Sequence, residues 1–511
     1  MSKCYVHTRH IPIEHLNLNI PMGQRIVANG LPGVLEGDNI KIISNANVEY
    51  IETRLVFSCL EKEEGKLDFS RVDRDIDRIE KLGFMPALFV WPQHVPKWVN
   101  ITRLKCLEHG LECTVPSLWE PKLLEYYDHV YGETAKRYGD RIKFLYFGIY
   151  GDYGEYTYPL GVKQYIFSSE HTHDGNWCGD ELAKADFAKC MKEKYGSIEA
   201  LNRAWGTVHC DFSSDMMPSV GVGGIAELDR ERWYADSLTK FTDKVCAIIR
   251  KHFPNTRGAM PLGIVGDRNG LNKSDAVKLC AKYNITPRWT GWAHLSDFGK
   301  SDSLCKRVSS AARLYGTDFG LEAALELYED NAGNAVFEAR SNGAVLIHND
   351  PGNYARAPEL YRKLTEVLCG ELPVIDTAIF YPLEDIWLSR IDIYDFAKDT
   401  GIIRAHTDYD LADSGMICEG FLGKVKTLIL TDGVAVPEKA LKVIRKWKEK
   451  GGIVKACGKV FTFESGEEIT DFEKTAYAPV DAPIYKTEFA SGTLYYDPVN
   501  NKIFEKKEKI K

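Results

Sequence analysis

A repeated alternation of apolar runs and amphipathic stretches fills residues 48–350 of this chain. The apolar runs have the length of buried strands, about four to eight residues, and the stretches between them carry apolar residues at helical spacing. In residues 69–82, Val72 and Ile76 fall on one face of a helix that Gly83 is expected to end. The alternation predicts βα units, whose strands run parallel in one sheet.

Eight strands of this kind can be placed along the chain. Eight parallel strands with helices between them favour a closed (β/α)8 barrel, or TIM barrel, over an open sheet. We predict this barrel domain over residues 1–372, with a helix at 104–109 before the third strand and a long insertion at 156–235 after the fourth. The predicted strands are 48–57, 84–90, 111–116, 142–147, 257–263, 288–293, 317–321 and 344–348.

After residue 372 the pattern changes. A clear amphipathic helix at 437–450 and further helices separate three short strand candidates, which predicts a doubly wound, flavodoxin-like α/β domain over residues 373–457. Residues 458–511 carry alternating Thr- and Tyr-rich runs and predict a small β-rich domain. The three strand candidates of the α/β domain are 377–381, 426–430 and 452–456.

Charge and hydropathy exclude two classes of partner. The net charge of −8 argues against nucleic-acid binding, which needs a basic surface. No run reaches the roughly 18 apolar residues of a membrane-spanning helix. Residues 1–10 also lack the apolar stretch of a signal peptide, so we expect a cytoplasmic location unless a signal has been trimmed.

The thirteen cysteines are scattered singly along the chain, with no C-x-x-C pair. Structural metal sites and disulfide frameworks both depend on ligands at characteristic spacing. We therefore expect free thiols, no metal ion and no cofactor.

Residues 147–159 place one carboxylic acid, Glu155, among aromatic side chains directly after a predicted strand. Partial removal of a carboxyl from water raises its pKa toward the range that a general acid needs. The alternative interpretation is that Glu155 caps a following helix. Glycines in the segment allow a tight turn and close approach to a ligand. The glycines are Gly148, Gly151 and Gly154, and the aromatic neighbours are Tyr153, Tyr156 and Tyr158.

Chemically useful side chains recur where the predicted strands end. In a parallel barrel the functional groups gather at the carboxyl ends of the strands. Carboxylates, imidazoles and indoles at one rim describe a ligand cleft, and the ten Trp and 26 Tyr of the chain suit carbohydrate binding. The expected substrate-binding residues are Arg54, Trp91, His94, Trp119, Asp152, Tyr153, Trp292, His294, His348, Asn349 and Asp350.

Two glutamates on different strands are the predicted catalytic pair. Glu155 follows the fourth strand and Glu322 the seventh, so their side chains are expected to face each other across the barrel. Cleavage of a glycosidic bond needs one protonated carboxyl and one ionised carboxylate. Hydrogen bonds from His294 or from His348 and Asn349 would keep Glu322 ionised. Glu326 is the alternative second carboxylate.

Several segments resemble the clan A glycoside hydrolases, especially the family 42 β-galactosidases. The segment 194–207, with its Tyr-Gly, Leu-Asn and Ala-Trp-Gly signature, is the most specific match. Residues 68–77, 96–98, 339–344 and 404–410 are similar to other parts of that family. The resemblance implies a retaining exo-β-glycosidase acting on terminal β-galactosides, with Glu155 as acid/base and Glu322 as nucleophile. It also implies a homo-oligomer, such as a trimer formed through the α/β domain.

One position departs from the clan pattern. Clan A enzymes usually carry Asn directly before the acid/base glutamate, and Gly154 stands there in this chain. The arrangement Gly154-Glu155 followed by Tyr158-Pro159 resembles instead the family 14 β-amylases, which invert. The alternatives are therefore a β-mannosidase, a uronidase or another β-glycosidase, an inverting glucan hydrolase, and a non-catalytic carbohydrate-binding barrel.

Overall fold

The computed structural model describes residues 17–21, 26–28, 48–151, 153–159, 171, 173–263, 266–291, 298–323, 332–349 and 371–507. The chain forms two compact units, of which the first contains residues 1–16 and 50–279 and the second residues 17–49 and 280–511. The division falls within helix α9, Lys273–Tyr283.

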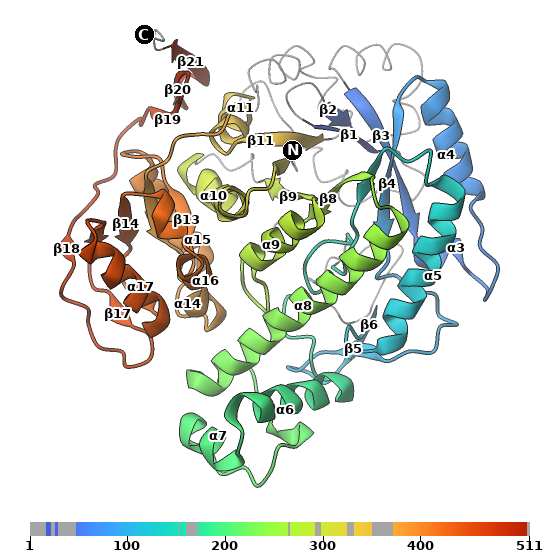
Figure 1. Ribbon diagram of the computed structural model, residues 1–511, viewed down its shortest axis with the longest axis horizontal. Coiled ribbons are helices and arrows are strands. Elements are labelled where there is room, and N and C mark those ends of the chain that lie inside the picture. Colours follow the sequence, from blue (N-terminus) through green and yellow to red (C-terminus); the bar gives the residue numbers. More distant parts are fainter. Residues whose placement is uncertain are drawn as a thin grey trace. The chain divides into compact units, whose positions relative to one another are not determined.

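The first unit is built on parallel strands that follow one another in the sheet in chain order. β3 (Val48–Val56) pairs with β4 (Met85–Trp91), β4 with β7 (Phe144–Tyr146), and β7 with β8 (Arg257–Pro261) (Figure 1). β4 is buried from its second residue to its last. A continuous apolar run is expected of a parallel strand whose two faces are both covered. Four of the predicted strands are thereby confirmed.

Helices between these strands follow the predicted periodicity. α4 (Ser70–Lys81) buries Val72, Ile76 and Ile79, and Gly83 continues the chain at φ +83°. α5 (Pro121–Tyr138) begins with Pro121 and is capped by the Glu120 carboxylate, which accepts from the amide of Lys122. α5 packs against the long helix α8 (Gly224–His252), and the two run side by side in Figure 1. The short helix α3 (Phe57–Leu60) follows β3 directly.

The predicted third barrel strand has a different partner. β6 (Glu112–Pro116) pairs antiparallel with β5 (Arg103–Lys105) in a separate two-stranded hairpin, so the helix predicted at 104–109 is wrong. The turn closes where the amide of Cys106 donates to the carbonyl of Leu111. Burial alternates along most of β6, which is typical of an antiparallel strand with one solvent-exposed face.

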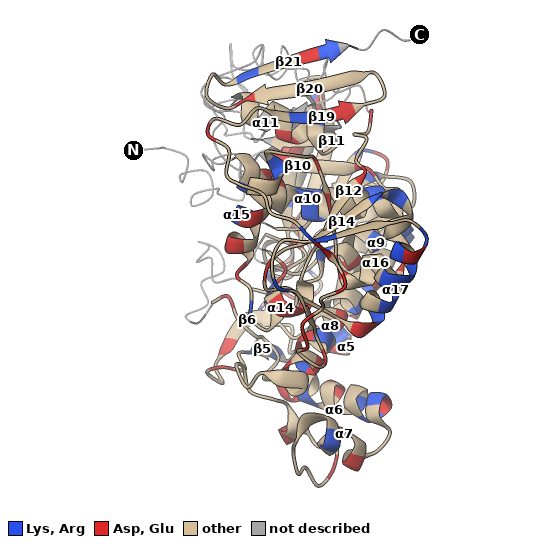
Figure 2. Cartoon of the chain, turned by 90° about the vertical axis from the view of Figure 1, so that its left-hand side faces the viewer, with Lys and Arg blue, Asp and Glu red and all other residues tan. Residues whose placement is uncertain are grey.

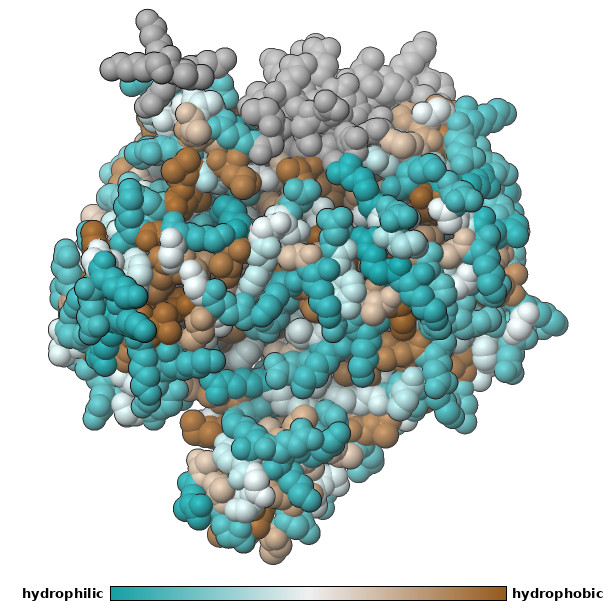
Figure 3. All heavy atoms as spheres, in the orientation of Figure 1, coloured by the Kyte–Doolittle hydropathy of each residue, from teal (hydrophilic) through white to brown (hydrophobic). Residues whose placement is uncertain are grey.

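The insertion after β7 contains the segment that resembles family 42. α6 (Glu181–Tyr195) starts at the Asp180 cap, and α7 (Ile198–Trp205) starts at Ser197, whose hydroxyl accepts from the amide of Ala200. A short 3-10 turn, η1 (Ser214–Met216), follows. On the face shown in Figure 3, the lobe formed by α6 and α7 carries mainly hydrophilic residues with small apolar areas between them.

The signature residues of that segment meet at one buried carboxylate. Tyr195 donates its hydroxyl to Asp229 at 2.5 Å, Trp205 donates its indole N–H at 3.0 Å, and Lys194 forms an ion pair with the same side chain. Asp229 lies on α8 and is 1% exposed. A buried carboxylate needs such donors, so the signature fastens α6 and α7 to α8.

The second unit begins with another parallel set. β10 (Phe319–Ala323) lies between β9 (Thr286–Gly291) and β11 (Ala344–Asn349), with α10 (Phe298–Tyr315) and α11 (Ala332–Ser341) as connecting helices. These strands confirm the last three predicted for the barrel. β1 (Asn17–Pro21) pairs antiparallel with β11, and β2 (Ile26–Ala28) pairs with β11 in parallel.

A second parallel sheet follows in the same unit, in the order β13-β12-β14-β16-β18. The three predicted strands correspond to β12, β14 and β16, and the predicted helix at 437–450 corresponds to α17. Lys and Arg dominate α17 in Figure 2, while Leu441 and Ile444 are buried beneath them. The remaining bounds are β12 Thr377–Phe380, α14 Leu383–Trp387, α15 Ile393–Arg404, β13 Asp410–Ala412, α16 Ser414–Cys418, η3 Phe421–Lys424, β14 Thr427–Leu430, β15 Ala435–Val436, α17 Glu438–Glu449, β16 Ile453–Ala456, β17 Phe461–Thr462 and β18 Glu473–Lys474.

The chain ends in a three-stranded antiparallel sheet, β19 (Tyr485–Phe489), β20 (Gly492–Asp497) and β21 (Lys502–Lys507). Its inner aromatic face packs on Phe298 of α10 and Phe337 of α11. Alternating burial along β19 and β20 matches the alternation in the sequence. Within the described ranges, no helix combines the length and apolarity that a membrane span requires.

Candidate active site

Glu155 lies in a tight turn that leaves the end of β7. The amides of Tyr150 and Gly151 both donate to the carbonyl of Glu155, and the amide of Ile149 donates to the carbonyl of Gly154. The next amide, of Tyr156, donates to the carbonyl of Pro261 at the end of β8. The backbone therefore holds Glu155 between the carboxyl ends of two parallel strands, where barrel enzymes carry their functional groups.

Glycines make this turn possible, as the sequence predicted. A Cβ atom at Gly148 would lie 1.8 Å from the carbonyl oxygen of Val90, and Gly154 has φ +71° with its Cβ position 3.0 Å from the same oxygen. A third glycine, Gly263, stands beside the acid itself, because a Cβ atom there would lie 3.2 Å from Oε2 of Glu155. Glu155 is 6% exposed.

The ends of β3 and β4 bring a cationic and an aromatic side chain to the same turn. The ring of Trp91 contacts Tyr153 at 5.8 Å and His94 at 6.3 Å between centroids. The guanidinium of Arg54 lies over the Trp91 ring at 4.9 Å, and its Nε is 3.6 Å from the carboxylate of Glu52 on β3. Trp91 Cδ1 would also be 3.3 Å from a Cβ atom at Gly154. Four predicted substrate-binding residues, Arg54, Trp91, His94 and Tyr153, are thus gathered around the Trp91 ring, which lies next to Gly154.

Two of the tyrosines expected around Glu155 have partners on α8. The hydroxyl of Tyr156 is 2.8 Å from the Thr239 hydroxyl, and Tyr158 donates to the carbonyl of Tyr234 while its ring stacks on Tyr234 at 3.8 Å. Burial raises the pKa of both hydroxyls. Tyr156 and Tyr158 therefore connect the segment that follows Glu155 to α8.

Trp119 has its aromatic contacts with α8. Its ring stacks on Trp233 at 5.1 Å and 12° and lies 6.5 Å from Tyr234. It lines a hollow of about 280 Å³ together with the start of α5 and Asp186 of α6. Its described contacts are thus with Trp233 and Tyr234.

The second unit holds Glu322 in a group of side chains from three neighbouring strands. Glu322 on β10 is in register with Thr290 on β9 and with His348 on β11, so the three side chains share one face of the sheet. Arg288 Nη2 is 2.8 Å from Oε2 of Glu322, and the Thr290 hydroxyl donates to the same oxygen at 3.0 Å.

His348 completes this group on the other carboxylate oxygen. Its Nδ1 is 3.4 Å from Oε1 of Glu322 and also contacts Nη1 of Arg288. Arg288 and His348 are each 2% exposed, whereas the side chain of Glu322 is 18% exposed. The buried partners orient the carboxylate, and the carboxylate itself stays accessible.

Sequence analysis missed Arg288 and Thr290. The signal was present, because Arg288-Trp-Thr290 places two polar side chains on one face of a strand that was otherwise expected to be apolar. His348 was predicted as a substrate contact, and its described neighbours are Arg288 and Glu322. The predicted residues Asp152, Trp292, His294 and Asp350 and the alternative Glu326 lie outside the described residues. The side chain of Asn349 is also outside the description.

Comparison with known proteins identifies the class of protein to which this chain belongs. The chain is 26% identical over 255 residues to β-galactosidase BbgII of Bifidobacterium bifidum, which covers 47% of this chain and 35% of that protein. It is 29% identical over 184 residues to a thermophilic β-amylase of Thermoanaerobacterium thermosulfurigenes, covering 33% of this chain and 32% of the relative. This chain thus matches about a third of the length of each of these two curated relatives.

A solved structure, the β-galactosidase from Bacillus circulans sp. alkalophilus, superposes with a TM-score of 0.62 at 15% identity. The superposition covers 82% of this chain and 68% of that chain. Parallel strands connected by helices are therefore a fold that this chain shares with that structure. The sequence model of one family, described as Beta-galactosidase (glycoside hydrolase family 42), matches residues 35–309, more than half of the chain. The chain belongs to glycoside hydrolase family 42, which confirms the resemblance seen in the sequence.

Proposed function

We propose that this protein hydrolyses terminal β-galactosides with retention of configuration, using Glu155 as acid/base and Glu322 as nucleophile. Membership of family 42 supports β-galactosides as the substrate class, because the matching family is described as Beta-galactosidase. The group around Glu322 supports the assignment of roles. Glu322 pairs with the Arg288 guanidinium at 2.8 Å, and a cationic partner suits a carboxylate that attacks an anomeric carbon.

The surroundings of Glu155 suit the opposite role. Glu155 is 6% exposed, so it is largely removed from water, and the preceding residue, Gly154, lies next to the Trp91 ring. In the first step Glu155 would donate its proton to the leaving oxygen while Glu322 attacks the sugar. In the second step Glu155 would take a proton from water, which then releases the sugar from Glu322.

The proposal requires the strands of the two units to close into one (β/α)8 barrel over residues 1–372. Retention requires the two carboxyl groups to be about 5–5.5 Å apart, whereas inversion requires about 6.5–9.5 Å. Arg54, Trp91, His94 and Tyr153 would then contact the sugar. We also propose a flavodoxin-like domain at 373–457, a β-rich domain at 458–511 and assembly into a homo-oligomer such as a trimer.

An inverting glucan hydrolase is the second candidate. It is favoured by the similarity to a β-amylase at 29% identity and by Gly154-Glu155 with Tyr158-Pro159. Gly154 suits the turn itself, since φ +71° favours glycine and a Cβ atom there would lie 3.0 Å from the Val90 oxygen, which is crowded for the Asn usual in clan A. Because the turn already explains Gly154, this glycine is weaker support for an inverting mechanism than the sequence alone suggested.

The test is a panel of chromogenic β-galactosides, β-mannosides and β-glucuronides, with soluble starch as the glucan. Proton NMR of the first-formed sugar identifies the anomer. We expect turnover of β-galactosides with the β-anomer appearing first. Release of β-maltose from starch without galactoside turnover would establish the second candidate.

A further inference from the structure

The hollow beside Trp119 lies outside the proposed reaction. It has a volume of about 280 Å³ and lies within the first unit, between the start of α5, α6 and the middle of α8. Pockets for small ligands combine apolar and aromatic walls with a few well-placed polar groups, and one sugar ring suits a hollow of this size. The lining of this hollow contains both kinds of side chain.

Trp119 provides the aromatic surface of the hollow. Its indole is partly exposed, and stacking on Trp233 at 5.1 Å and 12° holds the ring in place. Leu124 of α5 and Phe241 of α8 add apolar side chains to the same lining. The face of an aromatic ring carries partial negative charge, which attracts the C–H groups on the apolar face of a pyranose ring. The indole therefore offers a stacking surface for a sugar.

Asp186 of α6 provides a fixed hydrogen-bond acceptor. Its Oδ2 accepts from Nε1 of Trp233 at 2.8 Å, so the carboxylate is held in one orientation. Among the described residues, no donor bonds to its Oδ1. A carboxylate can accept several hydrogen bonds, so Asp186 retains capacity for the hydroxyl groups of a ligand.

Two lysines of α8 provide hydrogen-bond donors at the same hollow. Lys240 and Lys244 are four residues apart, so their side chains lie on one face of the helix, and both are exposed. Neither forms an ion pair or a hydrogen bond with another described residue. With Asp186 and Glu120, the lining holds two ammonium groups and two carboxylates, so its net charge is zero. This balance favours a neutral ligand rich in hydroxyl groups, because a hydroxyl can both donate and accept.

The elements that line the hollow are fastened to one another. Ser117, two residues before Trp119, donates its hydroxyl to the carboxylate of Asp180 at 3.2 Å. Asp180 also caps α6 by accepting from two backbone amides. This contact fixes the start of α6, which carries Asp186, to the segment that carries Trp119.

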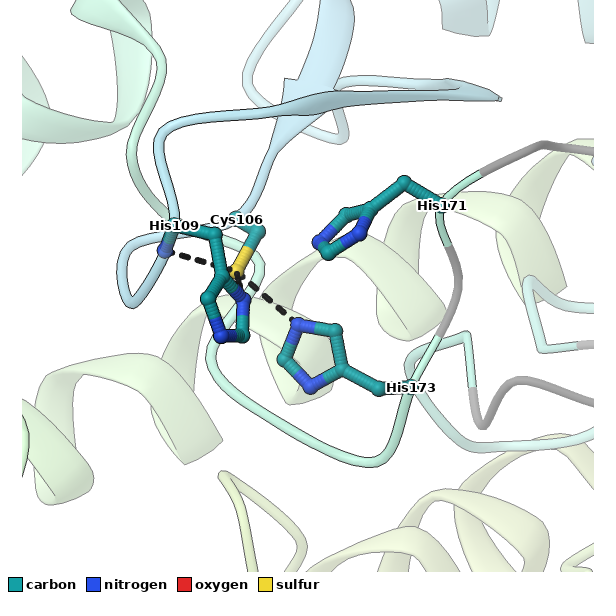
Figure 4. Close-up of side chains that lie close together, drawn as sticks. All are labelled: Cys106, His109, His171 and His173. Atoms are coloured by element: carbon teal, nitrogen blue, oxygen red, sulfur yellow. Dashed lines mark hydrogen bonds between the residues drawn. The ribbon is translucent and has the colours of Figure 1, made fainter.

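A second group of contacts holds the insertion ahead of α6. Figure 4 shows Cys106 and His109, in the turn of the β5–β6 hairpin, grouped with His171 and His173 of the insertion. Sγ of Cys106 is 2.9 Å from Nε2 of His173. Thiols and imidazoles are metal-ligand types, and the spacing in the sequence did not indicate that these four side chains meet. The insertion is thus attached to the hairpin before α6 begins.

The hollow is also linked to the acid turn through aromatic rings. Tyr234, next to Trp233 on α8, lies 6.5 Å from Trp119 between ring centroids. The same tyrosine stacks on Tyr158 at 3.8 Å, three residues after Glu155. A sugar bound at Trp119 would therefore be held on the same unit as the acid turn.

We propose that Trp119, Asp186, Lys240 and Lys244 form a second carbohydrate-binding site for one neutral hexopyranosyl residue of an oligosaccharide. The pyranose ring stacks on the indole, its hydroxyl groups donate to Asp186, and the two lysines donate to those hydroxyl groups. Trp119, expected from the sequence as a substrate contact of the active site, belongs to this second site instead. The site depends on the carbohydrate chemistry of the proposed function but not on galactose as the sugar.

The test uses the full chain labelled with fluorotryptophan, in which fluorine NMR reports on each of the ten Trp residues. Trp119→Phe identifies the Trp119 resonance by its disappearance. Methyl β-thiogalactoside, whose sulfur linkage resists hydrolysis, and methyl α-glucoside are the neutral probes, and galacturonate is the charged one. We expect at least one neutral probe to shift the Trp119 resonance saturably, and galacturonate to shift it less.

Lys240→Met removes one donor from an exposed position. It should weaken the binding that the Trp119 resonance reports by about two- to tenfold, which corresponds to one net hydrogen bond. The matched control is Lys192→Met, at an exposed lysine of α6 that does not line the hollow, and it should leave the binding unchanged.

Three results would overturn the proposal. The Trp119 resonance could stay unmoved by both neutral probes, respond only to galacturonate, or respond equally in Lys240→Met and the wild type. Hydrolysis of β-galactosides is measured separately. A Trp119 response that Lys240→Met weakens, in a chain without that hydrolysis, would remove the proposed function and support this site.

Discussion

Glu155 and Glu322 are the same residue type in two contrasting environments. The backbone positions Glu155, through a turn of glycines and carbonyl hydrogen bonds, and aromatic rings border it. Side chains hold Glu322, through a guanidinium, a hydroxyl and an imidazole from the two adjacent strands. An apolar border suits a proton donor and a cationic partner suits a nucleophile, so environment alone can assign different roles to two glutamates.

The difference also indicates which substitutions each region tolerates. Around Glu155 the critical atoms are backbone atoms, so added volume is the main hazard. Around Glu322 the critical atoms are charged side-chain atoms, so loss of charge is the main hazard. The following experiments test that contrast.

The largest effect is expected from Glu322→Gly. Loss of the nucleophile should lower kcat on the order of 10⁴-fold or more, because no covalent intermediate can form. Azide can occupy the vacated space and attack directly, so it should restore turnover and yield the inverted glycosyl azide, measured by NMR. Turnover near the wild-type value without azide would remove Glu322 from the mechanism.

Glu155→Gln should have a smaller and substrate-dependent effect. General acid catalysis contributes roughly 10²–10⁴-fold, and a nitrophenolate leaving group needs less of it than an alkyl alcohol does. In Glu155→Gln we therefore expect kcat/KM to fall most for alkyl galactosides. In Glu322→Gly it should fall equally for nitrophenyl and alkyl galactosides. An equal loss on both leaving groups would contradict the role of proton donor.

Arg288 tests the charge that holds Glu322. Arg288→Met should lower kcat by about 10²-fold, because the guanidinium that orients the nucleophile is lost. Arg288→Lys should recover part of this, since an ammonium supplies charge but not the guanidinium fork. The control is Arg445→Met on α17, which should leave kcat unchanged. A kcat of Arg288→Met close to the wild-type value would remove Arg288 from this role.

Gly154→Ala tests the backbone of the acid turn. Gly154 and Gly196 have nearly equal angles, φ +71° and +72°, but only Gly154 has neighbours within 4 Å. Left-handed backbone costs a non-glycine residue roughly 1–2 kcal/mol, so both alanine variants should lose about that much stability to denaturant. Gly154→Ala should lose more, and should also lose activity. Equal behaviour of the two would show that crowding at Val90 is unimportant.

The smallest effect on activity is expected at a third glutamate. Burial raises the pKa of Glu338 to about 8, with the Ser301 hydroxyl bonded to its carboxyl. Between the unfolded pKa of about 4.5 and pH 8 the folded state binds more protons, so stability should fall by at most about 5 kcal/mol as pH rises through this window. Glu338→Gln should flatten that decline in urea titrations, with unchanged kcat. The exposed Glu473→Gln is the control, and a decline that persists in Glu338→Gln would exclude this source.

Local patterns predicted the regular elements well. The helix at 437–450 and the strand at 344–348 were located to within one residue, because apolar spacing is a local signal. The run at 111–116 was recognised as a strand, but its partner was not. Pairing with β5 depends on a turn between Cys106 and Leu111, and an isolated strand pattern does not specify its partner.

The sequence by itself determined the βα rhythm and the family, and it suggested the two glutamates as the catalytic pair, because each of these depends on residue type and short-range spacing. Only the tertiary structure revealed Arg288 and Thr290 beside Glu322, and Cys106 beside three histidines. These groups join residues that are far apart in the chain. Their contacts are created by strand register and backbone hydrogen bonds, which no local pattern encodes.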